Sequence, residues 1–107
     1  MLSGTRAEAL KITMQYRARQ RMVYELASGD ASLAVHVWHE AADGVPEGWR
    51  VEAHESRAVD AIVITQNGST RREALLAVGK AWDCSEHRLP RFDWEAVAVL
   101  LASVRAL

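Results

Sequence analysis

The chain has 107 residues, half of them hydrophobic and a quarter charged, with a formal net charge of -1. This balance predicts one globular domain over residues 1–107, and the near-neutral charge argues against nonspecific binding to nucleic acid or acidic membranes. Cys84 is the single cysteine, so no internal disulfide can form, and because no apolar run has the length of a signal-peptide core or a membrane span we expect a cytoplasmic protein.

The N-terminal segment, residues 1–27, fits two periodicities. At helical spacing, five apolar side chains form one stripe: Leu10, Met14, Ala18, Met22 and Leu26. At a period of two, apolar and polar residues alternate from Leu10 to Arg19, as in a strand. Because the stripe continues beyond Arg19 and the segment is rich in good helix formers, we expect a helix. A strand through residues 22–24 is the alternative.

The following region, residues 31–65, has the pattern of a sheet. Ser28-Gly29-Asp30 is a clear break, and alternation then predicts strands at residues 33–38 and 49–54. The loop at residues 43–48 contains proline and two glycines and would join these strands as an antiparallel hairpin. A third strand is expected at residues 59–65, central or covered on both sides because both of its faces are apolar. The sheet would have three strands, or four.

A turn into a helix follows the third predicted strand. Gly68 permits the positive φ of a tight turn, and Ser69 or Thr70 can cap the first amides of the helix. Glu73 lies three residues after Thr70, which is the spacing of a capping box. The sequence therefore predicts that a helix begins at Arg71.

Two C-terminal helices complete the prediction. The first covers residues 71–82, and its Gly79 implies close packing against a neighbour, since glycine weakens a helix. The second begins after a capping Asp93 and has a buried stripe: Val97, Leu100, Leu101 and Val104. We therefore predict an α+β fold: an N-terminal helix, an antiparallel sheet of three to four strands, and both C-terminal helices packed on one face of the sheet.

Two known families resemble the strand–turn–helix region. Residues 65–75 resemble the end of the sheet in HicB-type antitoxin domains, where a Gly-x-Thr turn leads into a helix carrying Glu-Ala-Leu; the matching residues are Gly68, Thr70, Glu73, Ala74 and Leu75. The same helix start is similar to the Ser-Lys-Lys-x-Ala-Lys helix of the double-stranded-RNA-binding domain, with matches at Thr70, Arg71, Arg72 and Ala74. The first resemblance implies association with a protein, and the second implies contacts with RNA phosphates.

No catalytic or metal-binding group of residues stands out. His36 and His39 are three residues apart, so on a strand they point to opposite faces. Cys84 and His87 lack the second cluster that a structural zinc site needs. We therefore expect no catalytic residue, no metal and no cofactor. An enzyme that used His36, His54 and a carboxylate of the hairpin would need a pocket around them.

The candidate partner-binding residues lie on the hairpin: Trp38, His36, His54 and Trp49. Trp38 and Trp49 flank its loop, where we expect a cross-strand aromatic pair. Trp82 and Trp94 are expected in the core. Because no polar side chains converge on a site, we predict association with a protein partner or with a second copy, including strand addition at an open sheet edge.

Arginines give the alternative function, RNA binding. The candidate nucleic-acid-binding residues are Arg71, Arg72, Arg17, Arg19 and Arg21. Cations at a helix N-terminus oppose its macrodipole and can mark an edge that faces phosphates. Nearby acidic residues cancel most of the field, so the sequence favours protein association over nucleic acid and predicts no membrane partner.

Overall fold

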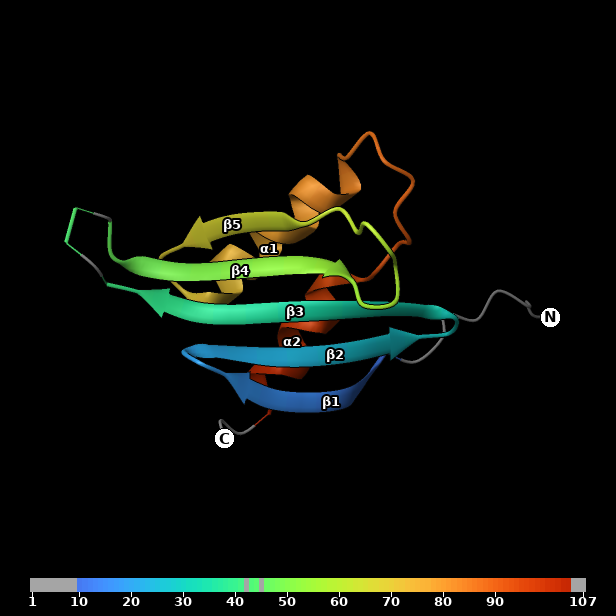
Figure 1. Cartoon of the computed structure of the whole chain (residues 1–107), viewed down its shortest axis with the longest axis horizontal. Coiled ribbons are helices and arrows are strands. Elements are labelled where there is room, and N and C mark those ends of the chain that lie inside the picture. The colour runs from blue at the N-terminus through green and yellow to red at the C-terminus, as the bar shows by residue number, and fades with distance from the viewer. Residues whose placement is uncertain (1–9, 42, 45, 105–107) are drawn as a thin grey trace.

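The computed structural model describes residues 10–41, 43–44 and 46–104. It has two layers, a five-stranded antiparallel sheet and two helices that cover one of its faces (Figure 1). The strands follow one another through the sheet in chain order: β1 (Lys11–Ala18), β2 (Arg21–Ser28), β3 (Ala31–Glu40), β4 (Gly48–Glu55) and β5 (Ile64–Gly68). The helices are α1 (Arg71–Asp83) and α2 (Trp94–Ala102). The α+β class and the antiparallel sheet are thus confirmed.

The predicted N-terminal helix is wrong, because the described part of that segment forms the hairpin β1–β2. Ala18 pairs with Arg21 across a two-residue turn in which Arg19 has φ 59°. Pairing of β2 with β3 buries Val23 on one face and Tyr24 on the other, and a helix with a single apolar stripe would not bury both. The alternation of period two therefore describes this segment. Residues 1–9 lie outside the described residues.

The third predicted strand is also misplaced, and the sheet has five strands instead of three to four. Asp60 has φ 56°, which interrupts an extended chain, and residues 59–63 form an exposed loop before β5 begins at Ile64. β5 lies at the edge of the sheet and pairs with β4. The predicted central position is therefore wrong. The hairpin loop lies where predicted, except that Gly48 already belongs to β4 and that Val45 lies outside the described residues.

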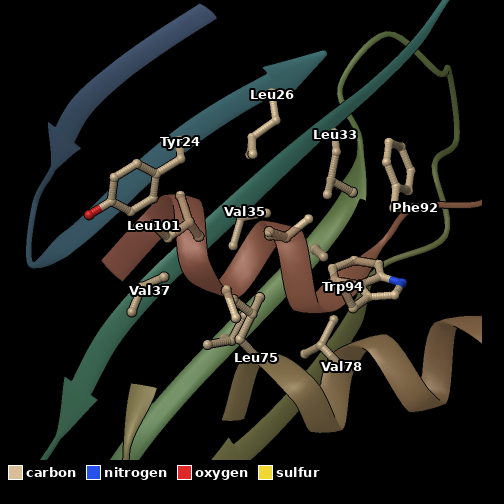
Figure 2. Close-up of a cluster of buried hydrophobic side chains, with 14 of the residues drawn as sticks. Tyr24, Leu26, Leu33, Val35, Val37, Leu75, Val78, Phe92, Trp94 and Leu101 are labelled. Carbon is tan, nitrogen blue, oxygen red and sulfur yellow. The ribbon is translucent and has the colours of Figure 1, made fainter. Parts of the chain in front are cut away.

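The core lies between the sheet and the helices (Figure 2). Leu33, Val35 and Val37 alternate along β3 and all point toward the helices. Side chains of both helices meet them: Leu75, Val78 and Trp82 from α1, and Trp94, Val97 and Leu101 from α2. Each fully buried aliphatic side chain stabilises the fold by about 1.5–3 kcal/mol relative to an exposed one. This layer of side chains holds the helices on one face only.

The start of α1 is capped as predicted, but Gly68, which precedes the helix, has a role other than the predicted one. The Thr70 hydroxyl accepts a hydrogen bond from the Glu73 amide at 3.0 Å, and a Glu73 carboxylate oxygen accepts one from the Ser69 amide at 3.4 Å. Gly68 does not have a positive φ. A Cβ on Gly68 would lie 2.5 Å from the Ala74 amide nitrogen, so the absent side chain lets the strand approach the helix.

The close packing predicted at Gly79 is confirmed. A Cβ there would lie 2.7 Å from the Cβ of Trp94, which joins α1 to α2. Trp82 and Trp94 are buried with Phe92, as edge-to-face ring pairs, and the Trp82 indole donates to the Pro90 carbonyl at 2.8 Å. In the part of the chain that the structure describes, neither helix is long and apolar enough to cross a membrane.

Candidate functional site

The face of the sheet opposite the helices is the candidate functional site, and we call it the open face. Along β3 it receives the residues that alternate with the core residues. Register places its side chains in three rows. The arginine row contains Arg21, Trp38 and Arg50; the central row contains Tyr16, Val23, His36 and Glu52; the glutamate row contains Met14, Glu25, Ala34 and His54.

Arg21 connects two of these rows. Its guanidinium carbon lies 3.9 Å from the centroid of the Trp38 ring, and its Nη1 lies 3.4 Å from a carboxylate oxygen of Glu52. A cation over an indole face is worth about 0.5–1 kcal/mol at a partly exposed site. These contacts fix the direction of the Arg21 and Trp38 side chains. The open face therefore presents an ordered aromatic and charged surface.

His36 lies at the centre of the open face. Its ring centroid is 5.6 Å from that of His54, and its Nδ1 is buried without a hydrogen-bond partner among the described residues. Burial lowers the pKa of His36 below its ordinary value of 6.5; His54 and Arg21 lower it further, while Glu52 and Glu25 oppose them. If the ring took up a second proton, Nδ1 would carry an N–H group, and no described acceptor could receive its hydrogen bond. His36 is therefore neutral at pH 7.

Three of the four predicted partner-binding residues come together on the open face: Trp38, His36 and His54. Trp49 does not join them. It lies in register with His39, at 5.1 Å between ring centroids, and packs against the core. The expected pair of Trp38 with Trp49 is absent because Trp38 lies opposite Arg50, which puts the two indoles on opposite faces of the sheet.

The five predicted nucleic-acid-binding arginines do not form one surface. Arg21 lies on the open face, whereas Arg17 lies in register with Met22 and thus on the helix-covered side. Arg19 lies in the turn between β1 and β2, and Arg71 and Arg72 begin α1. Arg72 is already paired with Glu95 of α2.

Several open-face residues were not predicted. Met14 and Tyr16 of β1 are 54% and 39% exposed there, and Glu25, Arg50 and Glu52 accompany them. The signal for the β1 residues was the alternation of period two, which the helical interpretation set aside. The three rows contain two arginines and two glutamates, so their formal charges balance.

The two edges of the sheet are poorly suited to strand addition. β1 has an irregular register between Ile12 and Met14 and carries Lys11 and Arg17, and such bulges and charges discourage edge pairing. β5 has only five residues. The predicted addition of a strand at an edge is therefore less well supported than contact through the open face.

The enzyme alternative requires a pocket at His36 and His54. Described residues form two cavities beside the helices that are not lined by these histidines. Among the described residues, no group of three or more histidine, cysteine, aspartate or glutamate side chains could hold a metal ion.

Comparisons with known proteins give no family. No family model matches the chain, and no curated protein or solved structure matches it significantly. The resemblances to HicB-type and double-stranded-RNA-binding domains stay predictions, and the function has to be argued from the open face.

Proposed function

We propose that this protein associates with a second copy of itself through the open face. The observation that carries the proposal is that, within the described residues, both helices lie on the other face of the sheet while this face presents Met14, Tyr16 and Trp38. Aromatic and methionine side chains are enriched in protein interfaces. Balanced charges favour a protein over a polyanion such as RNA, which binds to surfaces with an excess of cations.

The area of the open face suits a small stable dimer. Strands of about eight residues at about 3.4 Å each, in a five-stranded sheet with a spacing of about 4.8 Å, make a face of roughly 650 Å². Two copies would bury about 1,300 Å², which lies at the lower end of stable interfaces. We therefore expect a dissociation constant in the micromolar range, on the order of 1–10 µM.

One twofold axis makes the charges of Arg21 and Glu25 complementary between two copies, while Glu52, which lies on that axis, keeps its ion pair with Arg21 of its own copy. A twofold axis along the central row exchanges the arginine row with the glutamate row of the second copy. Arg21 then faces Glu25 of that copy, and the large Trp38 faces the small Ala34. Two sheets packed in this way keep their strands within about 30° of each other, which is the usual angle for face-to-face packing.

Multi-angle light scattering across a range of protein concentrations tests the proposal. We expect a dimer that dissociates on dilution, and Met14→Asp should weaken it at least tenfold, because a carboxylate would be buried in the interface. Val99→Asp is the matched control, since Val99 is 63% exposed on α2, away from the open face. A monomer at all concentrations, or equal weakening by both substitutions, would contradict the proposal.

A further inference from the structure

A second candidate site lies on the helix-covered side of the sheet. A cavity of about 250 Å³ opens between the start of α1 and the end of α2, which lie at the same end of the sheet in Figure 1. Apolar side chains form most of its lining: Val37, Leu75, Ala98, Leu101 and Ala102. Thr70, Arg71 and Arg72 supply its polar part. The cavity is larger than the 150 Å³ that admit a benzene molecule in an apolar site.

The polar part of the cavity is rich in hydrogen-bond donors. Arg71 has no ion pair with a described acidic residue, and its guanidinium carbon lies 5.4 Å from the centroid of the Trp49 ring. The Thr70 hydroxyl accepts from the Glu73 amide, so its own proton can be donated outward. The first amides of α1 add the positive end of a helix of 13 residues. These groups favour an anion.

Tyr24 gives an independent indication of a ligand. Its side chain lines the cavity and is 4% exposed, and no hydrogen bond between described residues involves its hydroxyl. Figure 2 shows the ring beside Leu101, with the hydroxyl directed away from Trp94, toward the side of the cluster where Val37 lies. The hydroxyl oxygen is not among the fully enclosed polar atoms, so it keeps access to the cavity. A ligand in the cavity could therefore accept its proton.

We propose that this cavity binds a small organic anion with a carboxylate head and an apolar body. Benzene fills a cavity of 150 Å³ with six carbon atoms, so a cavity of this volume has room for about ten non-hydrogen atoms. The carboxylate would accept from Arg71, the Tyr24 hydroxyl and the start of α1, while the body would contact Leu75 and Leu101. This site is independent of the proposed dimer, because it lies on the opposite side of the sheet.

Phenylacetate is a suitable probe, since it has about ten non-hydrogen atoms. Titration of the ¹⁵N-labelled protein should give saturable shifts at the amides of Arg71, Ala98 and Ala102, with a dissociation constant on the order of 1 mM. Phenylacetamide has the same shape without the charge and should bind at least tenfold more weakly. Equal binding of the two compounds, tighter binding of inorganic phosphate, or no saturable shift would overturn the proposal.

Substitutions locate the site. Tyr24→Phe removes only the hydroxyl, and Arg71→Gln removes the charge together with the guanidinium donors; each should weaken phenylacetate binding about five- to tenfold. Arg88→Gln is the control for net charge, because Arg88 is exposed in the loop between the helices and does not line the cavity. Thermal unfolding of each variant checks the fold. If Arg88→Gln weakened binding as much as Arg71→Gln does, or if Tyr24→Phe bound normally, the proposed site would be wrong.

Discussion

The two faces of the sheet bury side chains by different means. On the helix-covered face, Leu33 and Val35 are sealed by side chains of α1 and α2. On the open face, Val23 and Ala34 are 1% and 5% exposed although neither α1 nor α2 covers them. Val23 lies between Tyr16 and His36 in the central row, and Ala34 lies between Glu25 and His54 in the glutamate row, so longer side chains flank both. One face therefore stabilises the fold, and the other presents an amphipathic surface for a partner.

This comparison predicts that changes on the helix-covered face affect stability, and the largest effect is expected for Leu26→Ala. Leu26 is fully buried, so the substitution removes apolar contacts and leaves a cavity. We expect the free energy of unfolding to fall by about 2–5 kcal/mol. Urea denaturation measures this loss, at protein concentrations below the dissociation constant of the proposed dimer. A loss below about 1 kcal/mol would contradict the central position of Leu26.

The next effect is expected where the two helices meet. Gly79→Ala would place a methyl group 2.7 Å from the Cβ of Trp94, and the helices would have to separate. We expect a loss of about 1–3 kcal/mol in thermal unfolding, although alanine is the better helix former. Lys80→Ala on the exposed side of α1 is the control and should change stability little. A gain of stability in Gly79→Ala would show that the helices are not in close contact.

On the open face, smaller effects on stability are expected. A double-mutant cycle with Arg21→Ala and Trp38→Ala should give a coupling energy of about 0.5–1 kcal/mol, because the guanidinium lies over the indole ring. The cycle is measured by urea denaturation in dilute protein, where the monomer predominates. A coupling energy near zero would mean that the two side chains do not hold each other in solution.

The smallest effect concerns pH. Burial lowers the pKa of His36, so as the pH falls below 6.5 the unfolded chain takes up a proton more readily than the folded chain. Stability should therefore decrease between about pH 7.5 and 5.5, and His36→Gln should flatten this decrease. Denaturation curves of both proteins at several pH values give the difference. A steeper decrease in the variant would contradict the lowered pKa.

Local signals predicted the two C-terminal helices well. The cap at Thr70, the close contact at Gly79 and the burial of Trp82 and Trp94 each depend on residues near in sequence. Such signals have a direct physical basis in helix ends and in side-chain volume. The same holds for Gly29, whose φ of 60° forms the turn between β2 and β3.

The N-terminal hairpin was not predicted because its turn has no local signal. Arg19-Gln20 contains no glycine, asparagine or aspartate, and Arg19 nevertheless adopts a positive φ. A helical period and a period of two both fit these residues, so the pairing of β2 with β3 decides the structure there. The candidate site was found only in part for a different reason. Alternation within each strand places Trp38 on the face of His36 and Trp49 on the face of Val51, and the expected pair of the two indoles did not follow this alternation.

Mixing two charge variants tests the twofold contact through the open face most directly. In Arg21→Glu, two glutamates would face each other across the interface, and in Glu25→Arg two arginines would, so each variant alone should be a monomer. In an equal mixture, opposite charges would face each other at both contacts. Sedimentation equilibrium should then detect a heterodimer with an affinity close to that of the natural dimer. If the mixture stayed monomeric, or if either variant dimerised alone as well as the natural protein, the proposed association through the open face would be wrong.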